Sequence, residues 1–384
     1  MDEKIKRLLT RSVEEVIVKE SLEEKLSSDK KLVVKLGIDP TGSELHLGHA
    51  VVLRKLKEFQ DLGHKIVLVI GDFTAKIGDP SGRTEERKHL TDKQIQKNME
   101  SYKEQAGKIL DMDKAEFVYN SSWLGKLDLQ GLFELASKAT IAQIMERKEF
   151  RERVEHKVDV PYLEMLYPLM QGYDSVALKA DVELGGTDQK FNLLMGRQIQ
   201  KRYEQQEQDI VIMKLLPGTD GAKMSKSAGN YISLTANPHD MYGKVLSLSD
   251  EVMPTYFELC TYLDPSGEDK FRDKKRLAHE IVKLYHGEKL AQEAALNFEK
   301  VHQRGEYKES LLIHKTIPAG SYPIVELPVV SGATTSIVQS KELIRSGAVD
   351  INDKVLTADS WKQTIELKPS DMIRIGKNRI VKVE

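Results

Sequence analysis

The sequence predicts an α/β protein whose first and largest part is a doubly wound parallel sheet, followed by an α-helical part and a small α+β part. Two apolar, β-branched runs at residues 32–38 and 66–70 indicate buried strands. The segment between them has a helical pattern that ends at Gly63, a natural helix stop. The apolar residues of this pattern are Val52, Leu53, Leu56, Phe59 and Leu62. Strand, helix and strand form one parallel crossover unit, the first half of a Rossmann-like nucleotide fold.

A pair of histidines stands at the start of this helix. His46 and His49 are three residues apart, so their side chains project from one face of the first turn. Free N–H groups and the helix dipole favour phosphate at this position. Two imidazoles can donate hydrogen bonds as charge develops on an attacked α-phosphate. Gly48 between them leaves room for a base or ribose. The alternative is that two surface histidines cap a helix.

A lysine-rich loop lies about half a chain later. Residues 211–213 end another short apolar run, residues 217–221 form a flexible loop, and Lys223-Met224-Ser225-Lys226-Ser227 follows. Such a loop can close lysine charges onto a pyrophosphate leaving group and then release it. An ordinary solvated basic loop is the alternative for this segment alone. The two segments together, on one α/β domain, indicate binding of a nucleoside triphosphate.

These two segments resemble the signature motifs of class I aminoacyl-tRNA synthetases, HIGH and KMSKS, which read HLGH and KMSKS here. Residues 77–82, 167–174 and 185–189 extend the similarity to the bacterial tyrosyl-tRNA synthetases, over essentially the whole chain. The resemblance implies that L-tyrosine and ATP give tyrosyl-adenylate, and that tyrosine then passes to the 3′ end of tRNA(Tyr). It implies His46, His49, Lys223 and Lys226 as the catalytic residues.

The resemblance also implies which residues bind tyrosine. They are Asp79, Tyr167, Gln171, Asp174 and Gln189. Asp79, Tyr167 and Gln171 would contact the amino group, Asp174 would accept from the phenol hydroxyl, and Gln189 would lie by the carboxyl group. Tyr167, Gln171 and Asp174 have the spacing of one helix face. Alternatives are an Asx turn at Asp79 and a polar surface stripe on the helix.

ATP would contact a second set of residues by the same resemblance. They are Gly37, Asp39, Thr41, Gly48, Gly186, Asp188 and Met224. Mg²⁺ would arrive with ATP as part of the substrate, and no protein-bound metal is expected.

The chain departs from the better-known branch of the family at two places. Lys35 stands where that branch has a tyrosine that hydrogen-bonds the substrate phenol, so the second phenol contact is open. Arg83 replaces a lysine, and Arg87 follows four residues later. Either arginine keeps a cation available for phosphate or for the acceptor end of tRNA.

The resemblance also implies that parts of the chain beyond the first domain contact tRNA. We expect a catalytic domain over 1–232, a helical anticodon-binding domain over 233–316, a linker at 318–323 and an RNA-binding domain over 326–384. Residues 335–349 resemble the helical motif of the S4 RNA-binding domain. Within this tail Lys341 and Arg345 could touch phosphates, although nine Lys or Arg stand against eight Asp or Glu. Its expected core residues are Ile344, Val349, Ile351 and Val355.

Composition agrees with a cytoplasmic enzyme. The chain has 384 residues, 40% of them hydrophobic, with a net charge of −2, so tRNA would have to meet local basic patches such as residues 270–276. A solvated helix face is the alternative for that stretch. Cys260 is expected in the core, and neither a signal peptide nor a membrane span is expected. The family resemblance implies a homodimer. Rival functions are a tryptophanyl-type enzyme, a nucleotidyltransferase and an inactive RNA-binding relative.

Overall fold

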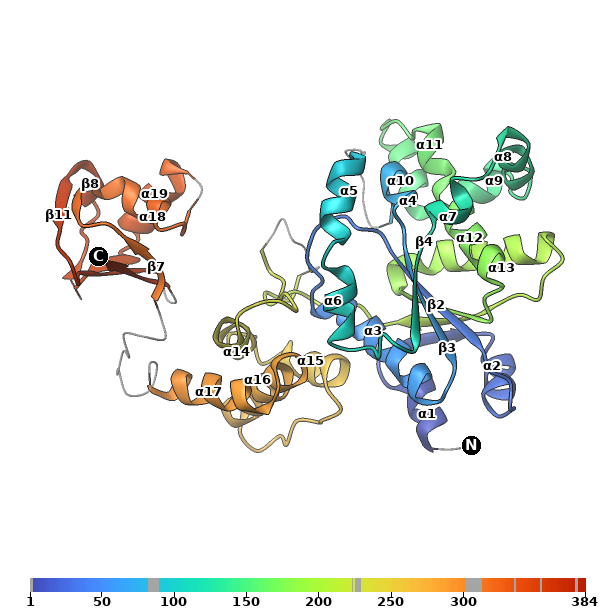
Figure 1. Ribbon diagram of the computed structural model, residues 1–384, viewed down its shortest axis with the longest axis horizontal. Coiled ribbons are helices and arrows are strands. Elements are labelled where there is room, and N and C mark those ends of the chain that lie inside the picture. Colours follow the sequence, from blue (N-terminus) through green and yellow to red (C-terminus); the bar gives the residue numbers. More distant parts are fainter. Residues whose placement is uncertain are drawn as a thin grey trace. The chain divides into compact units, whose positions relative to one another are not determined.

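The apolar runs of the sequence form the centre of a six-stranded sheet in the computed structural model (Figure 1). The structure describes residues 3–81, 90–222, 224, 229–300, 313–334, 336–352, 354–376 and 379–384. It divides into two compact units, Met1–Ala294 and Ala295–Glu384.

The sheet of the first unit has the strand order β1-β6-β5-β2-β3-β4. Its strands are β1 (Val13–Ile17), β2 (Val33–Ile38), β3 (Lys65–Ile70), β4 (Ala115–Tyr119), β5 (Val182–Gly186) and β6 (Asp209–Met213). β1 pairs antiparallel with β6, and every other pairing in the sheet is parallel. This confirms the predicted fold class.

The order of the strands fixes where a ligand can bind. From β2 the chain moves outward to β3 and β4, and it later returns to lay β5 against the other side of β2. The direction of winding therefore reverses between β2 and β5. In such sheets ligands bind beyond the carboxyl ends of the strands at this switch point.

Helices cover the sheet of this unit and join its strands. They are α1 (Glu3–Thr10), α2 (Lys19–Leu26), α3 (Leu47–Asp61), α4 (Thr74–Ile77), α5 (Asp92–Met99), α6 (Tyr102–Gly107), α7 (Ser121–Leu124), α8 (Leu129–Ala136), α9 (Ile141–Ile144), α10 (Lys148–Glu155), α11 (Tyr162–Met165), α12 (Tyr167–Leu178) and α13 (Lys190–Arg202), with a 3₁₀ turn η1 (Thr187–Gln189) before α13. α3 is the predicted crossover helix between β2 and β3. α12 and α13 pack on each other, and α12 also contacts β2.

The segment after β6 contains helices, as expected for the predicted helical part. Its helices are α14 (Pro238–Leu246), α15 (Met253–Cys260), α16 (Lys270–His286) and α17 (Glu288–Phe298). Cys260 is buried, as expected, and this burial raises the pKa of its thiol to about 12. The structure places α14, α15 and α16 in the first compact unit. The division at residue 232 stays a prediction.

The second unit is an α+β structure. Its five-stranded sheet has the order β10-β9-β12-β13-β7, and β11 pairs with β8 in a separate two-stranded sheet. The strands are β7 (Ile313–Ile317), β8 (Gly320–Pro323), β9 (Val349–Ile351), β10 (Lys354–Val355), β11 (Thr364–Leu367), β12 (Met372–Ile375) and β13 (Arg379–Val383). The helices are α18 (Leu327–Val330) and α19 (Ile337–Arg345), with 3₁₀ turns η3 (Ile324–Glu326) and η4 (Ser360–Lys362).

Two expectations for this unit are wrong. Residues 318–323 are not a plain linker, because Gly320–Pro323 pairs antiparallel with β11. Pro323 ends an edge strand, a place where proline is tolerated. Val355 is not in the core: it is 55% exposed on the two-residue strand β10. Ile344, Val349 and Ile351 are buried, as predicted.

No helix among the described residues is long and apolar enough to cross a membrane.

Candidate active site

The two histidines lie at the amino end of α3. His46 precedes the helix in an extended conformation, and its backbone N–H donates to His49 Nδ1 at 3.2 Å. The centroids of the two imidazole rings are 3.9 Å apart. Both rings therefore stand at the first turn of a 15-residue helix, where the dipole and the free N–H groups favour an anion.

The structure joins this turn to the segment that follows the lysine loop. His46 and Ser233 form a β-bridge, Leu47 N donates to Ile232 O at 3.0 Å, and Leu234 N donates to Leu45 O at 2.9 Å. The approach is also close from the loop itself: a Cβ added to Gly48 would lie 3.5 Å from Met224 Sδ. The chain thus brings together two motifs that are nearly 180 residues apart. Lys223 and Lys226 lie outside the described residues.

The turn after β2 is tied to α12 and α4. Asp39 Oδ2 accepts from Tyr167 Oη at 2.9 Å, and Asp39 Oδ1 accepts from Thr74 Oγ1 at 2.8 Å. Thr41 N donates to Asp39 O at 2.8 Å, which closes the turn. Tyr167 therefore contacts a residue expected to bind ATP, as well as standing on the helix of Gln171 and Asp174.

Asp79 is the centre of a polar cluster. Its Oδ2 accepts from Gln189 Nε2 at 2.7 Å, and its Oδ1 accepts from Ser81 N and Oγ at 2.9 and 2.7 Å. Arg147 Nη2 lies 3.4 Å from Oδ1, and its side chain is 1% exposed. Asn192 Oδ1 accepts from Arg147 Nη1 at 2.6 Å. Asp79 and Gln189, both expected to bind tyrosine, thus contact each other beside a buried guanidinium.

Asp174 is a buried residue of α12. Its Oδ1 accepts from Trp123 Nε1 at 2.8 Å, and its Oδ2 accepts from Asn120 Nδ2 at 3.4 Å. Burial raises the pKa of Asp174 to about 7, and the positive charge of Lys35 opposes that rise. A buried carboxylate with two neutral donors can accept one more hydrogen bond from a ligand hydroxyl.

Lys35 and Glu183 form a fully buried ion pair beside this carboxylate. They are register partners on β2 and β5, their side chains are each 1% exposed, and Lys35 Nζ is 3.0 Å from Glu183 Oε1. Lys35 Nζ also donates to the backbone O of Gln171 at 3.4 Å. Gln171 Nε2 donates to Glu183 Oε1 at 3.5 Å. Gln171 is therefore drawn toward the sheet.

The end of β5 completes the switch point. Gly186 is its last residue, and Asp188 follows in η1. A Cβ added to Gly186 would lie 2.9 Å from both Asp188 Oδ1 and Leu215 Cδ2, so only glycine fits without movement. Gly37, on the neighbouring strand β2, has no described atom within 4 Å of an added Cβ. The backbone of β2 is open to a ligand at that residue.

Sequence reasoning missed several members of the site. Trp123, Asn120, Arg147 and Glu183 stand in segments without a motif, and they reach the site only through packing of distant elements. Asn192 alone had a local signal, because it follows Gln189 by three residues and donates to Gln189 Oε1 at 2.9 Å.

The basic stretch 270–276 is largely paired with carboxylates. Lys270 and Lys274 both reach Asp250, at 3.2 and 2.8 Å. Arg276 lies 2.8 Å from Asp273 Oδ1. These ion pairs favour the interpretation of α16 as a solvated helix face.

In the second unit, Lys341, Arg345 and Lys362 surround the Trp361 ring at 4.3, 5.7 and 5.4 Å from its centroid.

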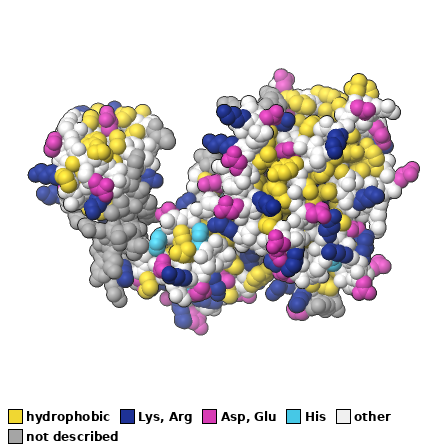
Figure 2. Space-filling model, viewed as in Figure 1, with side chains coloured by type: hydrophobic (Ala, Val, Ile, Leu, Met, Phe, Trp, Pro, Cys, Tyr) yellow, Lys and Arg dark blue, Asp and Glu magenta, His cyan; other side chains and the backbone are white. Residues whose placement is uncertain are grey.

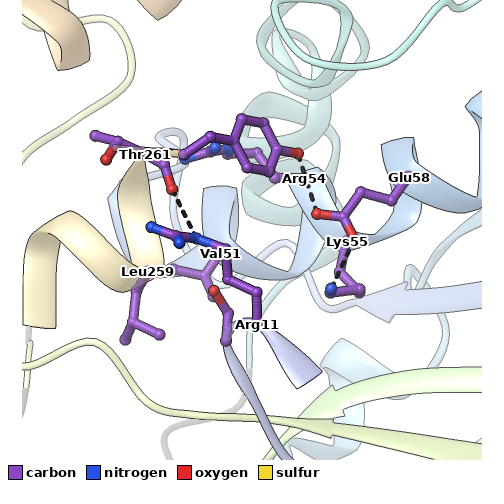
Figure 3. A pocket seen from close by; sticks show the side chains of 9 residues that line it. Arg11, Val51, Arg54, Lys55, Glu58, Leu259 and Thr261 are labelled. Atoms are coloured by element: carbon purple, nitrogen blue, oxygen red, sulfur yellow. Dashed lines mark hydrogen bonds and ion pairs between the residues drawn. The ribbon is translucent and has the colours of Figure 1, made fainter. Parts of the chain in front are cut away.

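A small pocket lies on α3 away from the histidines (Figure 3). Its volume is about 10 Å³, room for about one water molecule. Arg11 donates to Leu263 O at 2.8 Å, and Tyr262 Oη donates to Glu58 Oε1 at 3.0 Å. Lys55 Nζ donates to Leu8 O at 2.8 Å. These contacts join α1 and α3 to the segment after α15 and leave no room for a substrate.

Among the described residues, no group of three or more His, Cys, Asp or Glu side chains could hold a metal ion.

A largely parallel sheet, with a histidine pair joined to a distant loop at its switch point, is typical of an enzyme that acts on a nucleotide. The model of the class I tRNA synthetases (W and Y) matches residues 27–303. The chain belongs to this family.

Curated relatives agree with that assignment, and a solved structure shares the fold. The chain is 46% identical to tyrosine–tRNA ligase 2 of Clostridium acetobutylicum, over 100% of this chain and 98% of the relative. It is 44% identical to tyrosine–tRNA ligase of Moorella thermoacetica, over 98% of this chain and 95% of the relative. A C-terminally truncated mitochondrial tyrosyl-tRNA synthetase of Aspergillus nidulans has a similar fold, with a TM-score of 0.67, 22% identity, and 78% of this chain and 94% of that chain covered.

Proposed function

We propose that this chain is a tyrosine–tRNA ligase. It activates L-tyrosine with ATP to tyrosyl-adenylate and pyrophosphate, and transfers tyrosine to the 3′ end of tRNA(Tyr). The observation that carries the proposal is the β-bridge between His46 and Ser233, which joins the histidine pair to the segment after the lysine loop.

The tyrosine carboxylate is the nucleophile in the first step. It attacks the α-phosphorus of ATP, the bond to the bridging oxygen breaks, and pyrophosphate leaves with that electron pair. Catalysis then consists of positioning the two substrates and stabilising charge on the phosphates. His46 and His49 do this at the amino end of α3, and Lys223 and Lys226 do it from the loop. In the second step a ribose hydroxyl of the tRNA end attacks the carbonyl carbon, and AMP leaves.

Two groups of residues bind the substrates. Asp79, Tyr167, Gln171 and Gln189 hold the amino and carboxyl groups of tyrosine, and Asp174 accepts from its phenol. The hydrogen bond from Tyr167 to Asp39 supports a shared boundary between the amino acid and ATP. ATP is held by Gly37, Asp39, Thr41, Gly48, Gly186, Asp188 and Met224. Mg²⁺ accompanies ATP as substrate.

The proposed transfer step also requires surfaces that bind tRNA. We assign tRNA contacts to the helical part over 233–316 and to the S4-like part over 326–384, and we place the enzyme in the cytoplasm, where it serves translation. The cations around Trp361 support a role of the second unit in phosphate binding.

Pyrophosphate exchange with each amino acid in turn tests the substrate. Tyrosine alone should support strong ATP–pyrophosphate exchange. Strong exchange with tryptophan would favour the tryptophanyl-type enzyme, and exchange with no amino acid would favour an inactive relative.

We also propose that the enzyme is a homodimer. Apolar side chains gather on the face formed by α8, α9 and α11 (Figure 2), and Leu129, Phe133, Ile141 and Tyr162 are 63–70% exposed there. An exposed apolar patch of this kind marks an interaction surface. Sedimentation should give a dimer, and Phe133→Glu with Ile141→Glu should give a monomer. A monomeric parent chain would contradict this assignment.

A further inference from the structure

Lys35 is a buried lysine of β2 to which the proposed function assigns no role. Lys35 stands on β2 two residues before Gly37, so both residues belong to the same face of the strand. That face is open at Gly37, where no described atom lies within 4 Å of an added Cβ. A ligand bound at this end of β2 would therefore lie along the strand from the Lys35 side chain.

Helix α12 packs against β2 and contacts the Lys35 side chain. It brings the backbone carbonyl of Gln171 to 3.4 Å from Lys35 Nζ, and it carries Asp174 one turn further on. Asp174 is held by Trp123 and Asn120, and the charge of Lys35 acts on it. The Asp174 carboxylate of α12 and the Lys35 side chain of β2 therefore lie near each other.

Lys35 keeps a donor for a ligand. An ammonium group carries three N–H bonds and accepts nothing. Two of these bonds are directed to Glu183 Oε1, at 3.0 Å, and to Gln171 O, at 3.4 Å. Among the described residues these are the contacts of Nζ, so a third N–H is available. The ion pair places the carboxylate of Glu183, its register partner on β5, 3.0 Å from the buried Lys35 Nζ.

We infer that Lys35 is a specificity-determining residue that donates a hydrogen bond to the phenol oxygen of tyrosine, while Asp174 accepts from the same hydroxyl. This inference rests on the proposed role of Asp174. Phenylalanine would leave both the carboxylate and the ammonium without a partner. A site built to bond a substrate hydroxyl rejects the analogue that lacks it, and tyrosine-activating enzymes, which reject phenylalanine by about 10⁵-fold, are the standard example of this principle.

The test removes the donor without leaving a buried charge unpaired. The double variant Lys35→Met with Glu183→Gln is compared with the parent in ATP–pyrophosphate exchange, using tyrosine and phenylalanine. We expect kcat/KM for tyrosine to fall by about 10- to 100-fold while that for phenylalanine changes little, because the variant no longer has the hydrogen bond from a charged group. The single variant Glu183→Gln should lower the preference less, since its amide oxygen still accepts from Lys35.

A second buried pair provides the control. Lys25 and Asp209 are 2.8 Å apart, with side chains 10% and 2% exposed, and neither residue belongs to the site. Lys25→Met with Asp209→Asn should cost stability in the same way and leave the tyrosine-to-phenylalanine ratio at the parent value. A ratio in the Lys35 double variant within about threefold of the parent would overturn the inference.

Asp174→Ala separates the two levels of the proposal. If this variant loses discrimination and the Lys35 double variant does not, the phenol pocket stands and the role of Lys35 is wrong. If neither variant loses discrimination, the proposed pocket itself is wrong.

4-Aminophenylalanine tests the inference on the unaltered protein, should the double variant not fold. Its amino group can donate to Asp174 and is a poor acceptor for Lys35. We expect its kcat/KM to be at least about tenfold below that of tyrosine. Equal values would overturn the inference.

Discussion

At the scale of single residues, the chemistry of the site depends on buried polar groups that are held by neutral donors or by opposite charges. Asp174 lies between Trp123 and Asn120, and Asp79 lies between Gln189 and Arg147. Such groups lose hydration on burial, so each needs a partner in the protein or in the substrate. In the proposed function, the substrate supplies the remaining hydrogen-bond partners of these carboxylates.

The pKa of Asp174 gives a prediction for pH. Because burial raises this pKa to about 7, the carboxyl group is ionised above that pH and protonated below it. The ionised form is the stronger acceptor for the phenol hydroxyl, because a hydrogen bond to a charged oxygen is stronger than one to a neutral carboxyl group. The ratio of kcat/KM for tyrosine to that for phenylalanine should therefore be constant above about pH 8 and fall by about tenfold from there to pH 6.

Asp174→Ala is the control for this pH dependence. In this variant the ratio should be low at every pH, because no titrating acceptor remains, whereas ATP binding should change little. A pH-independent ratio in the parent, or an unchanged ratio in the variant, would remove Asp174 from phenol recognition. Both are measured by pyrophosphate exchange over pH 6–9.

Lys226 gives a kinetic prediction. Its charge is used mainly as pyrophosphate departs, so Lys226→Ala should lower the rate of adenylate formation by about 10²-fold or more and leave the tyrosine dissociation constant nearly unchanged. Single-turnover kinetics separate the two quantities. A variant that only weakens tyrosine binding would contradict the assigned role.

Residue-level prediction from the sequence succeeded where the motif itself was local. The helix that carries Tyr167, Gln171 and Asp174 is present, as the spacing of these residues predicts. Asp79 contacts Gln189 across 110 residues, which no local pattern indicates. The contact between Asp79 and Arg147 could not be predicted, because 68 residues separate them and only the packing of α10 against the site brings them together. The positions of these side chains are compatible with tyrosine binding, and their individual contacts with the substrate stay predictions.

At the scale of elements, α3 connects the site to the helical segment. Its first turn carries His46 and pairs with the chain after the lysine loop. Further along the helix, Arg54 lies over the Tyr262 ring at 4.5 Å from its centroid, after α15. The sequence predicted this helix from its spacing and its glycine stop. Its contacts with residues 232 and 262 had no local signal.

Gly48 tests the closeness of this packing. A Cβ added there would lie 3.0 Å from His46 Cε1 and Nδ1, so the imidazole would have to move. We expect Gly48→Ala to lower the rate of adenylate formation by about tenfold or more, since a displaced donor stabilises the phosphates poorly.

Gly243→Ala is the matched control, because Gly243 is inside α14 and no described atom lies within 4 Å of its added Cβ. This change should leave the rate unaltered and raise helix stability by about 0.5–1 kcal/mol. An equal loss of rate in both variants would show that the effect at Gly48 is not local.

Elements with weak periodicity were the ones that the sequence misplaced. β8 contains Gly320 and Pro323, which normally mark a loop, yet it pairs with β11 over four residues. The pairing depends on a strand about 40 residues further along, so a local pattern could not reveal it. β10 has two residues, too few for an alternating pattern to indicate which side of Val355 is buried.

At the scale of the whole molecule, the chain consists of two compact units whose boundary is at Ala294 and Ala295. Each unit has its own buried core. In the second unit, the first strand, β7, pairs in parallel with the last strand, β13. Cutting before Pro323 would therefore remove the partners of β7 and β8. A chain that ends at Lys300 keeps α17 and removes nearly all of the second unit.

This truncation separates amino acid activation from tRNA charging. Every proposed site residue lies before residue 227, so the shortened chain should keep ATP–pyrophosphate exchange within about twofold of the parent. Its rate of tRNA charging should be lower by about 10²-fold or more, because the second unit supplies phosphate contacts. In the full chain, Lys341→Ala with Arg345→Ala should lower the salt dependence of tRNA binding by about one unit of slope for each phosphate that is no longer neutralised. Both side chains lie over the Trp361 ring, so Lys341→Gln with Arg345→Gln, which keeps side-chain packing and removes charge, should give the same slope. Full charging by the truncated enzyme would show that the first unit alone binds tRNA, through its helical segment α14 to α17.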